Sequence, residues 1–233
     1  MPAVVKTGKV PLERALSKLG VASRSQTRQW ILDGTLKVNG RTITDPQFLV
    51  TPEKDRFEHH RKIFKAPQHC LVMLNKPAGY VTTRRDEKGR KTVYDLLPMM
   101  LGHLHPVGRL DMHTTGLLLL TTDTQLSARL TDPSNAIERV YVVTVEGRLT
   151  DEERQRLEGG IKEGGQLLRA KTIVARKISN RESHLIVTLI EGKNRELRRM
   201  FSAVDHEVTA LKRIAFGSWQ LGDLPVGQYK ELK

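Results

Sequence analysis

Short apolar runs of strand length recur along the last two thirds of the chain, and amphipathic helical patterns lie between them. The runs cover residues 70–74, 117–121, 140–145, 167–174 and 184–190. Among the helical patterns, Thr150 and Glu153 have the spacing of a capping box, and residues 194–204 carry Leu, Met and Phe at positions i, i+3 and i+4. The alternation predicts an α+β domain around a mainly antiparallel sheet.

The first quarter of the chain predicts a small unit of two helices and a hairpin. Residues 12–19 place apolar side chains on one stripe of a short helix, which Gly20 would end. Ser23 stands at a capping-box position before a second helix that Asp33-Gly34 would stop. Alternating residues then flank Asn39-Gly40, a typical two-residue hairpin turn.

Positive charge dominates the chain and is concentrated in this first unit. The sequence has 39 Lys and Arg against 26 Asp and Glu, a formal net charge of +13, and residues 1–65 hold 13 against 6. The positive electrostatic field of such a surface favours a polyanionic partner, nucleic acid first of all. A membrane surface is disfavoured, since neither a basic amphipathic helix nor a lipidation signal is found. Basic side chains off the apolar stripes include Arg14, Arg24, Arg28, Lys37 and Arg41.

Metal and disulfide chemistry have little support in the sequence. Cys70 is the only cysteine, which excludes an intramolecular disulfide and a Cys-rich zinc site and suits a reducing compartment. His59-His60 lies in a charged stretch without sustained periodicity, and residues 56–67 are therefore expected to form a linker with one possible short strand. His103, His105 and His113 lack a completing ligand set, so turn capping or phosphate contact is favoured. With no apolar stretch of membrane-spanning length, a cytoplasmic protein is expected.

The segments 22–26 and 36–40 resemble the small RNA-binding domain first known from ribosomal protein S-four, which is attached to several RNA-modifying enzymes. The resemblance covers residues 10–55 and leaves residues 1–9 as a tail. It implies that the basic side chains of this unit contact RNA. The regional excess of positive charge agrees with this independently.

Gly108 and Gly116 bracket a turn-rich segment that holds Arg109 and Asp111 directly before an apolar strand. Loops anchored on a rigid strand are where catalytic groups tend to lie. Most loop aspartates, however, cap a turn. From the residues alone, both interpretations of Asp111 remain open.

The run Gly108-Arg109-Leu110-Asp111 with Thr114-Thr115-Gly116 resembles the central motif of the pseudouridine synthases, in particular the branch that modifies ribosomal RNA. Four more segments resemble that family in order and spacing, and together they cover nearly all of residues 70–232: 74–79, 138–143, 191–200, and 211–217 with 224–227. Three positions depart from the family pattern: Arg139 in place of a usual lysine, Asp205-His206 in place of a common glycine, and Tyr229-Lys230 near a frequent arginine.

The resemblance implies a catalytic domain over residues 68–233 with Asp111, Tyr141 and Arg198 as its catalytic residues. Arg198 is expected to form an ion pair with Asp111, whereas Arg199 would point elsewhere. Tyr141 would stack on a flipped uracil, although a tyrosine among valines also suits strand packing. Further RNA contacts are expected from Arg109, Lys76, Lys193, Arg195, Lys212 and Arg213.

The predicted function is the site-specific conversion of uridine to pseudouridine in ribosomal RNA or a pre-ribosomal particle, by a monomer. The reaction needs no cofactor, no metal and no small-molecule substrate. Residues 83–90 resemble the large-subunit enzymes somewhat more. A non-catalytic ribosome assembly factor is the main alternative, and a methyltransferase is disfavoured because no glycine-rich cofactor loop is found.

Overall fold

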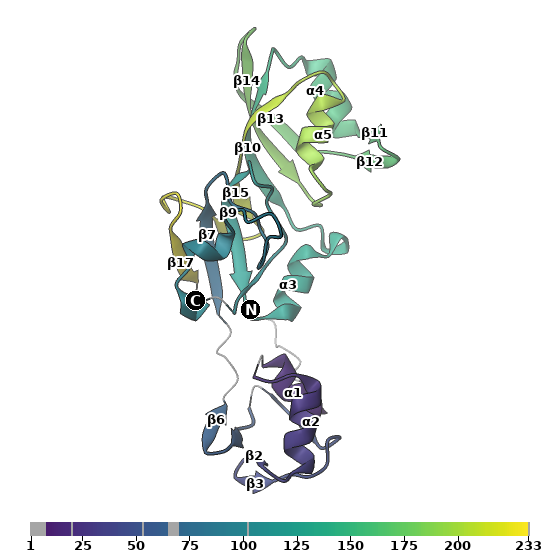
Figure 1. The fold of residues 1–233 in the computed structure, drawn as a ribbon. Helices are drawn as coiled ribbons and strands as arrows, with labels where there is room; N and C mark the ends of the chain where they lie inside the picture. Colours follow the sequence, from purple (N-terminus) through teal and green to yellow (C-terminus); the bar gives the residue numbers. More distant parts are fainter. Residues whose placement is uncertain (1–7, 20, 53, 65–69, 102, 233) are drawn as a thin grey trace. The chain divides into compact units, whose positions relative to one another are not determined.

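The computed structural model describes residues 8–19, 21–52, 54–64, 70–101 and 103–232, which form two compact units (Figure 1). The units are Met1–Gln68 and His69–Lys233. Residues 1–7 of the expected tail and residues 65–67 of the expected linker lie outside the described residues. No helix in the described part of the chain is long and apolar enough to cross a membrane.

The first unit contains the two predicted helices, α1 (Leu12–Lys18) and α2 (Arg24–Leu32). The Gln26 amide N–H donates to the Ser23 hydroxyl at 3.2 Å, and the Ser23 N–H donates back to the Gln26 side chain at 3.0 Å, which completes the predicted capping box. Asn39-Gly40 joins β2 (Leu36–Val38) to β3 (Arg41–Thr42), as the turn signal predicted. Two further short strands, β1 (Val10–Pro11) and β4 (Leu49–Val50), pair with each other.

The expected linker over residues 56–67 is wrong for most of its length. Residues 57–64 form a second hairpin, β5 (Phe57–His59) and β6 (Lys62–Phe64), which extends the sheet in the order β3-β2-β5-β6. Phe57 is fully buried in the core that α1 and α2 cover. Strands of three residues are too short to show a periodicity among charged neighbours, and pairing with β2 decides their conformation.

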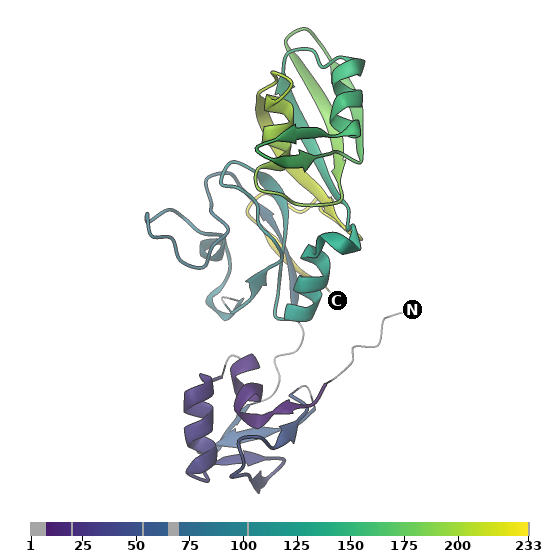
Figure 2. The ribbon, with the colours of Figure 1, turned by 90° about the vertical axis from the view of Figure 1, so that its right-hand side faces the viewer.

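The second unit confirms the predicted α+β class on a mainly antiparallel sheet (Figure 2). The sheet runs β13-β14-β10-β15-β9-β7-β17, with short β8 paired to β9 and short β16 paired to β15, and among these described strands only β15 and β9 pair in parallel. Its strands are β7 (Leu71–Lys76), β8 (His105–Pro106), β9 (Thr115–Thr121), β10 (Arg139–Glu146), β13 (Thr172–Ile178), β14 (Glu182–Leu189), β15 (Val208–Phe216), β16 (Trp219–Gln220) and β17 (Tyr229–Leu232). A separate hairpin joins β11 (Ile161–Glu163) to β12 (Gln166–Leu168), so the single strand expected over 167–174 is in fact divided between β12 and β13.

Helices cover both faces of this sheet. On one face, α4 (Asp151–Gly159) and α5 (Glu196–Ser202) pack on β10 and β14, and on the other α3 (Thr124–Thr131) packs on β9 (Figures 1 and 2). Strand β9 is apolar on both sides because Leu118 and Leu120 join one core while Leu117 and Leu119 join the other. Three short 3-10 helices lie in the connections: η1 (Val93–Leu96), η2 (Met99–Leu101) and η3 (Pro133–Asn135).

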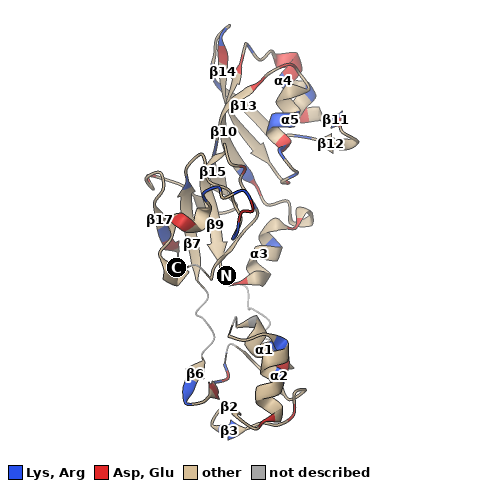
Figure 3. Cartoon of the chain, viewed as in Figure 1, with Lys and Arg blue, Asp and Glu red and all other residues tan. Residues whose placement is uncertain are grey.

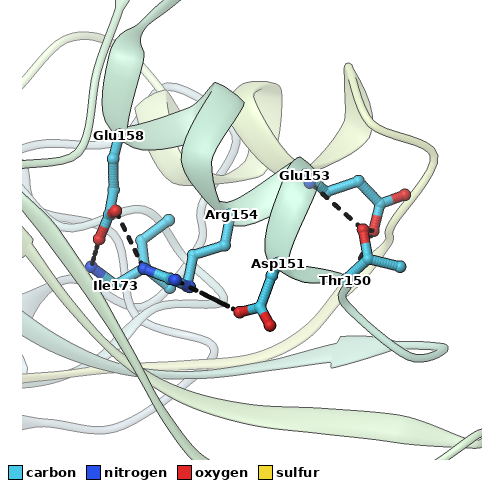
Figure 4. Close-up of polar contacts among 6 residues, drawn as sticks. All are labelled: Thr150, Asp151, Glu153, Arg154, Glu158 and Ile173. Atoms are coloured by element: carbon cyan, nitrogen blue, oxygen red, sulfur yellow. Dashed lines mark hydrogen bonds and ion pairs between the residues drawn. The ribbon is translucent and has the colours of Figure 1, made fainter.

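Polar contacts cap helix α4 at its first turn and fix its last turn to the sheet (Figure 4). Thr150 and Glu153 form the predicted capping box, with the Glu153 N–H donating to the Thr150 hydroxyl at 3.2 Å. Arg154 bridges Asp151 and Glu158, and the Glu158 carboxylate accepts the Ile173 N–H of β13 at 2.6 Å. The helix is thereby tied to the edge strand of the sheet.

Candidate active site

A cavity of about 470 Å³ opens in the second unit where four separate segments meet. These segments are the loop of residues 108–116 (the Asp111 loop), β10, residues 191–198 and β15. Its volume lies within the range of pockets that hold small ligands. Asp111, Tyr141 and Arg198 all line it, so the structure brings the three predicted catalytic residues into one cavity.

The Asp111 loop is held by backbone hydrogen bonds on both sides of the aspartate. The Thr114 N–H donates to the Asp111 carbonyl at 3.0 Å, which closes a tight turn, and the Gly79 N–H donates to the Met112 carbonyl at 2.8 Å. Before the aspartate, the buried hydroxyl of Thr82 donates to the Leu110 carbonyl at 2.8 Å. The carboxylate is therefore presented from a fixed backbone.

Lys76 supports this loop and is not available to RNA, contrary to the sequence-based prediction. Its side chain is fully buried at the end of β7. The ammonium donates to the carbonyls of Thr114 at 2.8 Å, Pro77 at 3.0 Å and Met112 at 3.3 Å. Burial lowers the pKa of Lys76 to about 8, and the nearby Asp111 charge opposes that shift.

Arg213 is likewise buried, but it also lines the cavity from β15. It is 3% exposed, its Nε donates to the Leu117 carbonyl at 2.8 Å, and its guanidinium lies 4.9 Å from the Phe216 ring centroid. Gly116 makes this approach possible, because a Cβ there would lie 2.2 Å from the Arg213 carbonyl oxygen and the glycine φ is +98°. The glycine thus brings β15 against the strand that follows the Asp111 loop.

The cation paired with Asp111 is Arg195, not the predicted Arg198. Arg195 Nη1 lies 3.8 Å from Asp111 Oδ2, with the two side chains 50% and 35% exposed. Arg198 Nη1 instead donates to the Val208 carbonyl at 2.7 Å. Burial lowers the pKa of Arg198, the Arg195 charge lowers it further, and Asp111 raises it, so Asp111 and Arg198 interact electrostatically without forming an ion pair. Arg199 points elsewhere, as predicted, toward Glu163.

Tyr141 both packs in the sheet and lines the cavity. It is 8% exposed and lies on the buried face of β10 together with Val143 and Val145. Tyr141 therefore has the packing role that its valine neighbours suggested, because alternate positions of a strand share one face. A register shift between Val140 and Tyr141 in the pairing with β15 marks a bulge, a feature often found beside active sites.

Two buried charged residues of the cavity were missed as site residues. Arg139 is 5% exposed and donates to the carbonyls of Leu130 at 3.0 Å and Ile190 at 3.1 Å, which joins the segments that border the cavity. Glu196 is 3% exposed, its Oε2 accepts the Lys193 N–H at 3.0 Å, and its Oε1 has no partner. Burial and the adjacent Glu191 carboxylate raise the pKa of Glu196 to about 7. The sequence does hold a signal for Glu196, because it precedes the buried Met200 by four residues of a helix.

The remaining predicted RNA contacts fall into two classes. Lys193 is engaged internally, because it pairs with Glu191 and donates to the Leu167 carbonyl at 2.7 Å. Arg109 and Lys212 are exposed. In the first unit the predicted contacts are exposed as well, on helices and strands where Lys and Arg are marked in Figure 3: Arg14, Arg24, Arg28, Lys37 and Arg41.

Asp205-His206, which stands where the family pattern commonly has a glycine, has a structural explanation. Asp205 has a φ of +60°, a conformation that glycine adopts most easily. The neighbouring His206 is 8% exposed, its Nδ1 donates to the Glu146 carbonyl at 2.6 Å, and its Nε2 lies 3.2 Å from the Glu153 carboxylate. The imidazole therefore links β10 to the start of α4.

Metal ligation has no support among the described residues. No group of three or more His, Cys, Asp or Glu side chains lies close enough together there to hold an ion. His103, His105 and His113 are all exposed.

Comparison with known proteins agrees with this architecture. The sequence model described as RNA pseudouridylate synthase matches residues 70–203, and that of the S4 domain matches residues 10–56. The chain belongs to the RNA pseudouridylate synthase family. This confirms the resemblance found in the sequence, for both the catalytic domain and the N-terminal RNA-binding unit.

Relatives of this synthase-family chain match it over nearly its whole length. An "Uncharacterized RNA pseudouridine synthase" of Aquifex aeolicus (strain VF5) is 35% identical, covering 96% of this chain and 90% of the relative. A "Ribosomal large subunit pseudouridine synthase B" of Bacillus subtilis (strain 168) is 35% identical, covering 95% and 91%. A crystal structure of a pseudouridylate synthase superimposes with a TM-score of 0.65 at 27% identity, covering 96% of each chain.

Proposed function

We propose that this synthase converts a uridine of large-subunit ribosomal RNA to pseudouridine, with Asp111 as the catalytic carboxylate. The observation that carries the proposal is the setting of Asp111. Its side chain lines the cavity from a backbone that Lys76 and Thr82 hold in place, and Arg195 and Arg198 face it. A positioned carboxylate beside cations is what this chemistry requires.

The isomerisation breaks the bond from ribose C1′ to uracil N1 and joins C1′ to C5, with no net gain or loss of atoms. A carboxylate serves either by attacking the nucleotide or by taking the C2′ proton, and both roles need its ionised form. Lys76, Arg195 and Arg198 supply positive charge near the Asp111 carboxylate. No step calls for a cofactor or a metal.

The target uridine must leave its base stack to reach Asp111, because neither C1′ nor C5 is accessible within stacked RNA. A cavity of about 470 Å³ suits a flipped nucleotide. Tyr141 in its wall offers an aromatic face, and base stacking of this kind contributes about 1–3 kcal/mol. Its hydroxyl is our candidate for assisting removal of the C5 proton.

Arg198 and Arg195 have different roles in this proposal. Arg198 is anchored by the Val208 carbonyl and is partly buried, so it stabilises Asp111 from a fixed position. Arg195 is half exposed and its contact with Asp111 is long, so it is free to move to an RNA phosphate.

The substrate assignment rests on the relatives and on charge. The Bacillus subtilis relative is named a large-subunit enzyme, and the exposed basic residues of the first unit favour RNA or a pre-ribosomal particle. We expect the protein to act as a monomer in the cytoplasm.

The decisive experiment measures tritium release from ribosomal RNA labelled at uracil C5. The wild-type protein should release tritium, and Asp111→Asn should abolish release while RNA affinity stays within about twofold, since phosphate contacts by Lys and Arg, and not a single carboxylate, supply most of the affinity. Asp223→Asn, at an exposed turn, is the matched control and should retain full activity.

Two results would contradict the proposal. An active Asp111→Asn variant would remove the aspartate from the mechanism. A wild-type protein that is inert on unmodified small- and large-subunit RNA and on immature particles, yet binds them, would favour a non-catalytic assembly factor.

A further inference from the structure

Two turns of the first unit have the same left-handed backbone and very different sequences. The β2–β3 turn holds Asn39 at φ +51° and Gly40 at φ +83°. The β5–β6 turn holds His60 at φ +46° and Arg61 at φ +64°. Two-residue turns of this kind strongly favour Asn-Gly, because a Cβ destabilises the left-handed conformation. The second turn therefore carries two bulky basic side chains at a conformational cost, and an outlier of this kind indicates a function.

The side chains at the β5–β6 turn are open to solvent, and no acidic partner for them is found among the described residues. His60, Arg61 and Lys62 are all exposed. Among the described residues, neither Arg61 nor Lys62 forms an ion pair with a carboxylate, whereas Arg28 of the same unit pairs with Glu13 at 3.1 Å. The turn thus presents positive charge that nothing within the described part of the unit neutralises.

Aromatic rings continue from this turn into the unit. The His60 ring lies 4.2 Å from that of His59, and His59 is stacked on Trp30 at 3.9 Å with an interplanar angle of 16°. Trp30 is also nearly parallel to Phe64, and Lys62 Nζ lies 5.7 Å from the Phe64 ring. Burial lowers the pKa of His59, as does His60 beside it, so His59 contributes a neutral ring near pH 7. Exposed cations beside a series of rings are typical of surfaces that bind single-stranded RNA.

We propose that the β5–β6 turn is an RNA contact for an unpaired nucleotide, in which the His60 ring stacks on the base and Arg61 and Lys62 bind the flanking phosphates. The proposal rests on RNA as the partner of this synthase, and it assigns a specific surface to that binding. It concerns binding by the first unit and makes no use of Asp111.

The test exchanges one turn for the other in the full-length chain. His60→Asn with Arg61→Gly installs the Asn-Gly sequence that the β2–β3 turn already has. We expect thermal stability to stay the same or rise, while affinity for a labelled ribosomal RNA stem-loop falls about tenfold and the slope of log K against log salt decreases by about one. A fully paired duplex of equal length should show a smaller loss, because it offers no unpaired base.

Controls separate this surface from charge in general and from catalysis. Lys54→Asn removes one exposed charge at the opposite end of β5 and should cost at most about twofold in affinity. Lys62→Gln, outside the turn, should weaken binding without altering the turn. Tritium release at saturating RNA should remain at the wild-type rate, so a failure of this inference is distinguishable from a failure of the proposed activity.

The inference would be overturned if the double variant bound RNA as tightly as the wild type or no more weakly than Lys54→Asn. An equal loss of affinity for the stem-loop and the duplex would also overturn it, since the turn would then bind phosphate charge without contacting an unpaired base. A double variant less stable than the wild type would show that His60 and Arg61 carry no conformational cost in this turn. If Lys62→Gln then also bound RNA with wild-type affinity, the β5–β6 turn would be rejected as an RNA contact.

Discussion

The basic residues predicted to bind RNA differ between the two units. The five in the first unit are all exposed, whereas of the six in the second unit Lys76 and Arg213 are buried and Lys193 is held by Glu191, and only Arg109, Arg195 and Lys212 are exposed. The difference follows from architecture. Helices of a small unit bury one stripe and leave the other face to solvent, but a sheet covered on both sides buries many of the side chains of its central strands.

The comparison teaches that a basic side chain in an RNA-binding enzyme is not by itself an RNA contact. Within the sheet, a cation serves the fold by donating to buried backbone carbonyls, as Lys76 and Arg139 do. Buried cations should therefore affect stability and turnover, and exposed ones affinity. The following predictions test that division, from the largest effect to the smallest.

Lys76→Met should have the largest effect. It removes a charged donor from three backbone carbonyls, of which Met112 keeps the Gly79 N–H, so we expect the free energy of unfolding to fall by about 2–4 kcal/mol. Displacement of the Asp111 loop should lower kcat about 100-fold. Chemical denaturation and tritium release measure the two effects. Lys230→Met, an exposed lysine of β17, is the control and should change neither; a stable and active Lys76→Met variant would refute the structural role.

Arg198→Gln and Arg195→Gln should separate the two kinds of cation within one cavity. Arg198 is anchored at the Val208 carbonyl, so its loss should lower kcat about 100-fold with little change in RNA affinity. Arg195 is half exposed, so its loss should mainly raise KM and reduce the salt dependence of binding by about one unit of slope. Steady-state kinetics at several salt concentrations measure kcat and KM for both variants and so distinguish the two roles. The reverse pattern would assign the stabilisation of Asp111 to Arg195.

Glu196→Gln should change how stability depends on pH. The pKa of Glu196 is raised to about 7 in the folded protein from an ordinary 4.5, so between these values the folded state keeps a proton that the unfolded state has lost. The contribution of this group to stability is present below pH 4.5 and is lost as pH rises through 7. The stability of the variant relative to the wild type should rise between pH 5 and pH 8 by roughly 2–3 kcal/mol.

The control for this pH effect is Glu152→Gln, an exposed position of α4. It should leave the stability difference between pH 5 and pH 8 as it is in the wild type. A Glu196→Gln variant with the wild-type pH dependence would show that Glu196 is ionised throughout.

Arg24→Gln should have the smallest effect, confined to binding. Arg24 is exposed at the start of α2, so RNA affinity should fall about threefold and the salt slope by about one. The free energy of unfolding should stay within about 0.5 kcal/mol of the wild type. Filter binding across a salt series measures the affinity and its salt slope, and thermal melts measure the stability. A marked loss of stability would contradict the expectation that exposed cations affect binding and buried cations affect stability.

Local signals in the sequence were sufficient for much of the fold. The capping boxes at Ser23 and Thr150 start helices where predicted, and Asn39-Gly40 forms its turn, because each signal acts within a few residues. Strand β15 was not predicted as an element, since Lys212 and Arg213 interrupt its apolar pattern. Its place at the centre of the sheet comes from pairing with β9 and β10, residues distant in sequence.

The order and spacing of the sequence motifs were sufficient to predict the family and the α+β class, and the family resemblance implied that Asp111, Tyr141 and Arg198 act together. The fold was needed to show that these three residues line one cavity, which arginine pairs with Asp111, that Lys76 and Arg213 are buried, and that residues 57–64 complete a sheet. The physical reason is the same in each case. Burial and charge pairing depend on neighbours far along the chain, and no local pattern of residues records them.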